Sequence, residues 1–390
     1  MQRNVPQRDP IMILFISSFV IFLYVTASLF LFSSCRSSLQ WISIALLFII
    51  SQKYLVYNYL GGAFFAPALP RPFLLLMEAL YGALLIFFVM LLLKDLLVPL
   101  LRRSGLFGIP GPFPFSMAGL KAGLAVLALA LGVWGTWQAV RVPDIRTVEL
   151  RLPSLPRSLD GFSIVQLTDT HIGPLLKKEW LRQVVDKANS LSPDLILLTG
   201  DYIDGTVAAL REEVTPFAGL RATYGVYGVT GNHEYYWGAA EWSALMQALQ
   251  VTMLHNEHRV LTIGNEKLVI AGMPDRTERA HGGEGPDIEA TMEGAPEVTR
   301  ILLAHQPRDA ASCSRFADVQ LSGHTHGGTV FFLKPLVALF NKGFVQGLYD
   351  LDGKKLYVSP GTGIWNGFSC RIGVPAEMTH IILRAADTPA

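Results

Sequence analysis

The sequence predicts two regions of different class: an N-terminal membrane region of about four helices and a C-terminal α/β domain. Only 16% of the 390 residues are charged and 51% are hydrophobic, whereas an ordinary soluble domain has about 25% charged residues. The first 140 residues hold only nine basic and three acidic side chains. All nine histidines follow residue 170, where short apolar strands alternate with helical patterns. This contrast separates a lipid-facing part from a globular part.

Overall charge and cysteine content exclude several classes of protein. The high hydrophobic content excludes a disordered chain. A formal net charge of +1 gives no basic excess, so we expect no nucleic-acid partner. Three cysteines without a CxxC spacing cannot form a disulfide framework.

Four apolar runs define the predicted membrane region, residues 1–140. They cover residues 11–32, 41–60, 73–93 and 118–138, and a helix needs about 20 residues to cross the hydrocarbon core. Lys53 interrupts the second run, and we expect it to reach the interface or face the helix bundle. Glu78 lies near the start of the third run, where we expect an interfacial carboxylate, with a functional acid inside the membrane as the alternative. The chain is therefore predicted to be an integral protein of the plasma (inner) membrane.

The orientation in the membrane depends on basic residues in the loops. The two sides carry equal numbers of them, but Lys94, Arg102, Arg103 and Lys121 form one compact group around the third loop. Because positive loops tend to stay in the cytoplasm, this group favours an extracytoplasmic C-terminal half.

The second region begins after a proline-containing linker, predicted at residues 141–158, and extends over residues 159–390. Short apolar runs predict strands at residues 162–167, 195–198, 226–229, 301–304 and 319–321. Helical spacing predicts helices at 178–190 and 241–250, and Gly264-Asn265 predicts a hairpin turn. This alternation is typical of an α/β domain.

Each of these five strands leads directly into residues that can bind a metal ion. Ligands of open α/β sheets gather at the carboxyl ends of strands. The motifs are Asp169-Thr170-His171, Gly200-Asp201, Gly231-Asn232-His233-Glu234, His305, and Gly323-His324-Thr325-His326-Gly327-Gly328. Glycine beside a ligand lets backbone approach a crowded centre. Imidazole, carboxylate and amide ligands without thiolate suit Mn, Fe or Zn.

In this order the motifs resemble those of the calcineurin-like metallophosphoesterases. The resemblance covers about residues 159–383 and implies a four-layer α/β/β/α sandwich with two divalent metal ions, with Mn expected first and Fe or Zn as alternatives. Further signatures are similar to the membrane-associated branch, which includes transmembrane proteins with a metallophosphoesterase domain and relatives of the UDP-diacylglucosamine hydrolases. The signatures similar to this branch are Gly347-Leu348-Tyr349, residues 356–363, Arg371 and Pro375-Ala376-Glu377.

The resemblance also implies a role for each site residue. One metal ion would be held by Asp169, His171 and His326, the other by Asn232, His305 and His324, and Asp201 would bridge the two. A hydroxide between the metal ions would attack the phosphorus atom. His233 would protonate the leaving oxygen or stabilise charge on the phosphoryl group, with orientation of Asn232 as the alternative. We expect Glu234 to fix the tautomer of His233 and Asp204 to cap a turn.

The substrate prediction depends on residues 330–340, an apolar stretch directly after the second histidine motif. If exposed, Phe331, Phe332 and Leu336 would contact the bilayer or the acyl chains of a lipid-linked phosphate; if buried, they would be core. A membrane-anchored phosphoesterase acting on a lipid-linked ester or pyrophosphate is the leading hypothesis. The alternatives are a phosphodiesterase for a soluble nucleotide or small phosphodiester, and a membrane transporter or scaffold with a metal-binding domain.

Overall fold

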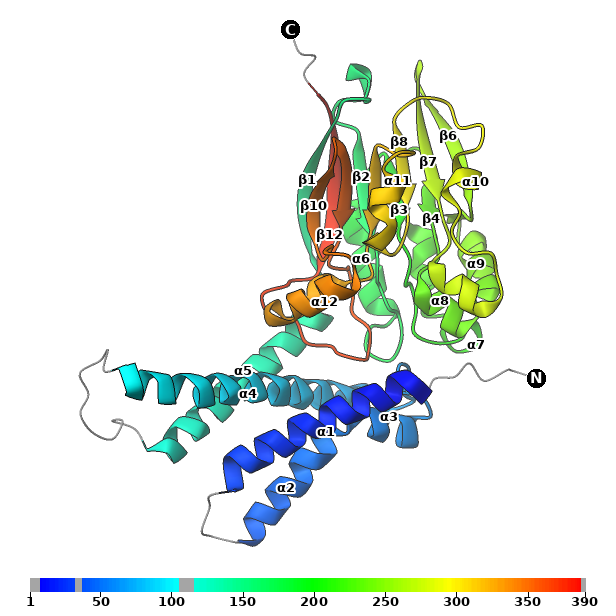
Figure 1. The fold of residues 1–390 in the computed structure, drawn as a ribbon. Helices are drawn as coiled ribbons and strands as arrows, with labels where there is room; N and C mark the ends of the chain where they lie inside the picture. Colours follow the sequence, from blue (N-terminus) through cyan, green and yellow to red (C-terminus); the bar gives the residue numbers. More distant parts are fainter. Residues whose placement is uncertain (1–7, 32–36, 105–115, 387–390) are drawn as a thin grey trace. The chain divides into compact units, whose positions relative to one another are not determined.

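The computed structural model describes residues 8–31, 37–104 and 116–386, which divide into two compact units. The helical unit consists of the described residues up to Gln138 together with Gly367–Cys370. The sheet unit contains the described residues from Ala139 onward, apart from those four. Both can be followed in Figure 1.

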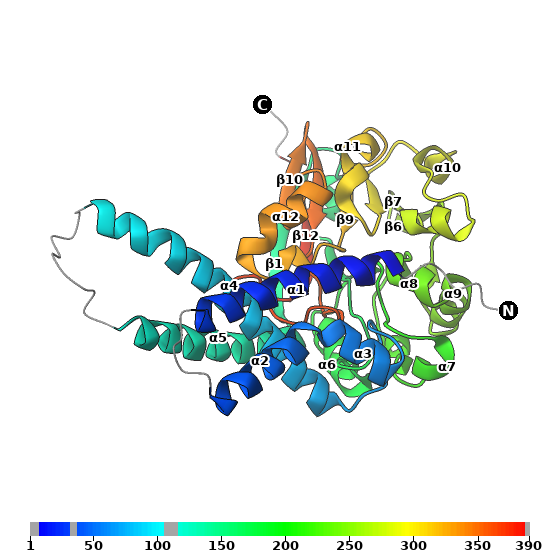
Figure 2. The ribbon, with the colours of Figure 1, turned by 60° about the horizontal axis from the view of Figure 1, so that its bottom comes forward.

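The helical unit contains five helices: α1 (Arg8–Phe30), α2 (Ser38–Ser51), α3 (Lys53–Gly61), α4 (Arg71–Ser104) and α5 (Met117–Val140). α1 packs against α2 and α4 (Figure 2). In the described residues, α4 and α5 are long and apolar enough to cross a membrane, and α2 with α3 forms a third candidate that bends by 70°. Leu14–Phe30 of α1 is a shorter apolar helix. The structure thus supports two or three spans and not clearly the predicted four. Residues 105–115, the part of the third loop between Arg103 and Lys121, lie outside the described residues, and the predicted orientation stays an expectation.

Lys53 and Glu78 form a buried ion pair within the helical unit. Nζ of Lys53 lies 2.8 and 2.7 Å from the two carboxylate oxygens of Glu78, and both side chains are 0% exposed. Lys53 therefore faces the interior of the helical unit, one of the two positions expected from the sequence; the depth of Glu78 in the membrane stays an expectation. A charge in an apolar environment is costly unless it is paired, and each of these residues supplies the partner of the other.

The sheet unit contains two six-stranded sheets. The first has the order β1-β12-β2-β3-β4-β5 and the second β10-β11-β9-β8-β7-β6. In the first sheet, β2 to β5 are parallel; in the second, β7, β8, β9 and β11 are parallel. The strands are β1 (Asp144–Leu152), β2 (Ser163–Leu167), β3 (Leu195–Leu198), β4 (Val226–Gly228), β5 (Thr252–Met253), β6 (Glu257–Ile263), β7 (Glu266–Gly272), β8 (Arg300–Leu303), β9 (Val319–Ser322), β10 (Gly347–Leu351), β11 (Lys354–Val358) and β12 (Glu377–Ala385).

Seven helices lie between these strands. They are α6 (Lys178–Asn189), α7 (Val207–Leu210), α8 (Asn232–Trp237), α9 (Ala239–Ala248), α10 (Ile288–Met292), α11 (Ala310–Cys313) and α12 (Lys334–Phe340). On α6, Leu181, Val184, Val185 and Ala188 are buried, which agrees with the helical spacing that predicts this helix. The predicted linker, residues 141–158, contains β1, which pairs with β12 along nine residues. It is therefore largely part of the first sheet.

One hydrophobic core joins the two sheets. It includes Ile164 and Leu197 from the first sheet and Ile270, Ile301 and Leu321 from the second, all buried. Two sheets with intervening helices agree with the α/β class that the sequence predicts. The order of four layers stays an expectation from the resemblance.

Candidate metal centre

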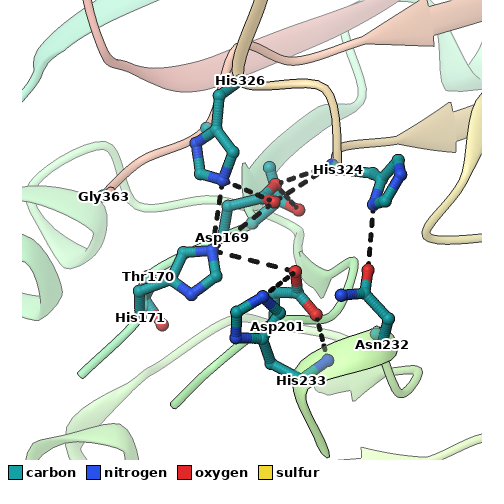
Figure 3. Close-up of polar contacts among 12 residues, drawn as sticks. Asp169, Thr170, His171, Asp201, Asn232, His233, His324, His326 and Gly363 are labelled. Carbon is teal, nitrogen blue, oxygen red and sulfur yellow. Dashed lines mark hydrogen bonds and ion pairs between the residues drawn. The ribbon is translucent and has the colours of Figure 1, made fainter. Parts of the chain in front are cut away.

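The structure brings together the seven side chains that the sequence predicts as metal ligands, six of which are labelled in Figure 3. They lie just after β2, β3 and β4 of the first sheet and β8 and β9 of the second, with Asn232 as the first residue of α8. The residues are Asp169, His171, Asp201, Asn232, His305, His324 and His326. Their ligand atoms form two neighbouring clusters.

The first cluster consists of Asp169, His171 and His326, all buried. Nε2 of His171 lies 3.1 Å from Nε2 of His326, and a dashed line joins these two nitrogens in Figure 3. Oδ1 of Asp169 lies 3.4 Å from Nε2 of His326 and 3.9 Å from Nε2 of His171. Two imidazole nitrogens and a carboxylate oxygen that converge in this way form a donor set for a cation.

The second cluster contains Asp201, Asn232, His305 and His324. Nδ1 of His305 lies 2.7 Å from the carbonyl oxygen of Thr199, which can only accept, so this nitrogen carries hydrogen. Nε2 of His305 then faces Oδ2 of Asp201 at 3.1 Å and Oδ1 of Asn232 at 3.2 Å. Oδ1 of Asn232 also lies 2.9 Å from Nδ1 of His324. Four electron-pair donors therefore point at one another.

One carboxylate oxygen borders both clusters. Oδ2 of Asp201 lies 3.1 Å from Nε2 of His305 in the second cluster and 3.8 Å from Nε2 of His171 in the first. The two clusters offer imidazole nitrogens, carboxylate oxygens and one amide oxygen, which suit Mn, Fe or Zn. The residues present therefore fit two divalent ions with a shared carboxylate.

Five of the seven residues have a left-handed backbone, which is unusual for non-glycine residues. The φ angles are 53° for Asp169, 45° for His171, 54° for Asp201, 71° for His324 and 48° for His326. Such conformations cost about 1–3 kcal/mol each and persist only where surrounding contacts enforce them. Here the Asp169 N–H donates to Gly200 O at 2.9 Å and the His171 N–H to Asp201 O at 3.1 Å. The strained turns thus hold each other in place.

Glycines make room for the ligands, as the sequence predicts. A Cβ atom on Gly231 would lie 2.2 Å from Oδ1 of Asp201, and one on Gly323 would lie 2.1 Å from Oδ2 of Asp169. Any side chain at these positions would displace a ligand carboxylate. The motif glycines are therefore required by the close approach of backbone and ligand.

His233 lies beside the shared carboxylate. Its Nδ1 is 2.5 Å from Oδ1 of Asp204, and its Nε2 is 3.9 Å from Oδ2 of Asp201. Burial alone would lower the pKa of His233, but the carboxylates of Asp201 and Asp204 outweigh it and raise the pKa to about 9. The rings of Tyr236 and Trp365 lie 5.2 and 6.3 Å from the His233 ring, centroid to centroid. His233 also lies close enough to Asp201 and His171 to be a further donor.

Glu234 and Asp204 exchange the roles that we expect from the sequence. The Glu234 carboxylate accepts backbone N–H groups of Asp201 at 3.0 Å, Tyr202 at 2.8 Å and Gly231 at 2.7 Å. It therefore ties the turn after β3 to the turn after β4. Asp204 instead contacts Nδ1 of both His233 and His171, the latter at 3.3 Å. The two imidazoles outweigh the effect of burial and lower the pKa of Asp204 to about 2.

Arg371, which the sequence offers only as a family signature, supports the first cluster. Its side chain is buried, and its Nη2 donates to the carbonyl oxygens of Pro360 and Gly363 at 2.8 Å each. Its Nη1 lies 3.3 Å from His326 O. The Gly363 N–H donates to Asp169 O at 3.0 Å. Arg371 and the 360–363 turn therefore contact the backbone of both His326 and Asp169. No local sequence signal predicts this role of Arg371.

The apolar stretch after the second histidine motif is exposed. It forms a short 3₁₀ turn, Phe331–Leu333, followed by α12. Phe331, Leu336, Leu339 and Phe340 are 59%, 54%, 76% and 65% exposed, whereas Phe332 is half-buried. Of the two alternatives that the sequence leaves open, the structure therefore supports a surface and not a core segment.

Comparisons with known proteins agree with this site. The model of the family described as calcineurin-like phosphoesterase matches residues 162–328. A Bos taurus protein named transmembrane protein with metallophosphoesterase domain is 38% identical over 282 residues, which are 68% of this chain and 63% of that protein. A Campylobacter jejuni protein named uncharacterized metallophosphoesterase is 36% identical over 268 residues, which are 67% of this chain and 68% of that protein. A protein of the same name from Helicobacter pylori J99 is 33% identical over 278 residues, which are 69% of this chain and 73% of that protein. The chain thus spans less than two thirds of the bovine relative.

Proposed function

Because the chain belongs to the calcineurin-like metallophosphoesterases, which are metal-dependent phosphoester hydrolases, we propose that it hydrolyses a lipid-linked phosphate ester or pyrophosphate while anchored in a membrane. The observation that carries the catalytic part is the position of Asp201, whose Oδ2 borders both donor clusters. A shared carboxylate is what a pair of neighbouring divalent ions requires.

We assign the first ion to Asp169, His171 and His326 and the second to Asn232, His305 and His324, with Asp201 shared. Mn is the proposed metal. When bound, two such ions lower the pKa of water and neutralise phosphate oxygens.

The protein groups around the centre supply orientation and a proton. His233 faces the shared carboxylate with Nε2, while Asp204 holds its Nδ1. A ring held in this way can donate the Nε2 proton to the leaving oxygen of the ester. Burial of the surrounding groups keeps bulk water away, which strengthens the electrostatic contribution of the site.

Two features support a lipid-linked substrate. The described residues contain two or three candidate membrane spans, and only residues 141–143 separate α5 from β1. The exposed apolar side chains of α12 follow the His326–Gly328 turn by a few residues, and the helix contacts that turn. A large exposed apolar patch on a soluble protein usually marks a contact with a membrane or partner. A plasma-membrane location with an extracytoplasmic sheet unit is part of the proposal, and protease protection of intact cells would test it.

The test is turnover of defined substrates by the full-length protein in liposomes with Mn²⁺. Phospholipids, nucleotide-sugar lipids and water-soluble phosphodiesters would be compared, with the Asp201→Asn variant as the inactive control. We expect hydrolysis of a lipid-linked substrate by the wild type and near-complete loss of turnover and of bound metal in the variant, because the shared anion is lost. Hydrolysis of soluble esters alone would contradict the lipid part, and a variant that keeps two metal ions and full activity would contradict the site assignment.

A further inference from the structure

Four residues, Gly367–Cys370, belong to the helical unit, although the residues on either side of them belong to the sheet unit. Three of the four contact α4 at positions i, i+3 and i+4, which lie on one face of a helix. The pairs are Ser369 with Glu78, Phe368 with Tyr81, and Cys370 with Gly82. The segment is therefore held along α4 by three consecutive residues.

The ion pair of the helical unit lies at the centre of these contacts. The Ser369 N–H donates to Oε2 of Glu78 at 2.9 Å, and the Tyr57 hydroxyl donates to Oε1 at 2.9 Å. Lys53 donates to both oxygens. Nζ of Lys53 also lies 4.5 Å from the centre of the Tyr81 ring, a favourable cation–π distance. Lys53 thus fixes the carboxylate that binds the backbone of the segment.

The chain that leaves this segment leads directly to the metal centre. Cys370 is followed by Arg371, whose guanidinium holds the carbonyl oxygens of Pro360 and Gly363. A Cβ atom on Gly361, inside this turn, would lie 3.1 Å from Nδ1 of His326 and 3.2 Å from Cβ of Asp169. The turn therefore packs directly on two residues of the first cluster.

We propose that Lys53 and Glu78 are positioning residues of the phosphoesterase. Their ion pair fixes residues 368–370, and Arg371 then holds the 360–363 turn against Asp169 and His326. The inference rests on the proposed assignment of these two residues as metal ligands. It gives the helical unit a part in catalysis in addition to anchoring.

The chemistry of the pair supports this role over simple helix packing. A buried ion pair contributes little stability compared with well-packed apolar residues of similar volume. An apolar residue at position 78, however, could not accept the hydrogen bond of the Ser369 N–H. Hence helix packing alone does not explain a hydrogen-bond acceptor at position 78. The acceptor is required to bind the Ser369 N–H, and Lys53 neutralises its charge.

The test compares two double variants of the full-length protein in nanodiscs. Lys53→Met with Glu78→Leu removes the charges and the acceptor, whereas Lys53→Met with Glu78→Gln removes the charges and keeps an acceptor oxygen. Because both variants remove the two charges together, neither variant contains a buried charge without its partner. Hydrolysis of bis(p-nitrophenyl) phosphate is titrated with Mn²⁺. We expect the Leu variant to need about 10–100-fold more Mn²⁺ for half-maximal activity, the usual effect of losing support for metal ligands, and the Gln variant to resemble the wild type.

A glycine pair provides a second, milder test in case the Leu variant does not fold. A methyl group on Gly82 would lie 3.0 Å from Sγ of Cys370, whereas one on Gly123 meets nothing within 4 Å. Both Gly82→Ala and Gly123→Ala raise helix propensity. We expect only Gly82→Ala to raise the Mn²⁺ requirement and to speed maleimide labelling of Cys370, measured by peptide mass spectrometry.

The outcomes separate this inference from the proposed function. A wild type that hydrolyses neither this ester nor a lipid-linked substrate with Mn²⁺ would contradict the proposed function itself. An active wild type with an unchanged Mn²⁺ requirement in the folded Leu variant and in Gly82→Ala would overturn only the positioning role. An equal rise in both double variants would also overturn it, because the acceptor would then not matter.

Discussion

Oδ1 of Asp204 lies 2.5 Å from Nδ1 of His233. Because a carboxylate can only accept, this contact places hydrogen on Nδ1 and turns Nε2 toward Asp201. The arrangement is the one expected for a ring that must be held in a single orientation while it exchanges a proton at the other nitrogen.

We therefore expect Asp204→Asn to lower kcat by about 10–100-fold, the usual cost of losing a carboxylate behind a functional histidine. The amide keeps the volume and one acceptor, so the fold should be retained. Metal content at saturating Mn²⁺, measured by mass spectrometry, should stay at the wild-type value. Unchanged kcat would show that other contacts orient His233.

His233→Ala should keep both metal ions and slow hydrolysis by about 10²–10⁴-fold, the usual contribution of general acid–base catalysis. The loss should be smaller for a nitrophenolate leaving group, which needs little protonation, than for an alkoxide. Rates for both substrates with the same variant check this. An equal loss for the two would instead indicate stabilisation of phosphoryl charge or orientation of Asn232.

The convergence of the seven candidate ligands could be predicted from the sequence because each of their motifs follows an apolar strand, and that pattern is local. The carboxylate that contacts His233 could not be predicted. Glu234 is adjacent in sequence but binds backbone N–H groups, and only the folded turns bring Asp204 to the ring. The same holds for β1 within the predicted linker, since its partner β12 lies more than 200 residues away. Hydropathy also does not reveal the 70° bend between α2 and α3.

A prediction for the backbone follows from the close approach of Gly323 to Asp169. Gly323→Ala should greatly lower metal content and activity, because the new Cβ would lie 2.1 Å from Oδ2 of Asp169. Gly219→Ala is the matched control, since its Cβ would meet only Cγ1 of Val185, at 3.3 Å. Circular dichroism would confirm that both variants fold. Normal metal content in Gly323→Ala would show that the turn relaxes without loss of the ligand.

The last prediction concerns the exposed apolar face of α12. Leu336→Ser with Leu339→Ser removes exposed apolar area that would be worth about 25 cal/mol per Å² on entering a membrane. Activity on a dispersed chromogenic ester should survive, and activity on a lipid substrate in liposomes should fall. Leu348→Ser on β10 is the control, because Leu348 is similarly exposed but lies outside α12.

The two assays on one folded variant distinguish a lipid-contacting surface from a structural one. Serines at exposed positions should leave the melting temperature unchanged, since little apolar contact is lost. A parallel loss of both activities with a lowered melting temperature would mean that α12 supports the fold, for example through the neighbouring His326–Gly328 turn. A selective loss of lipid hydrolysis, absent in Leu348→Ser, would instead place the substrate's acyl chains or the bilayer surface at α12, next to the turn that carries His326.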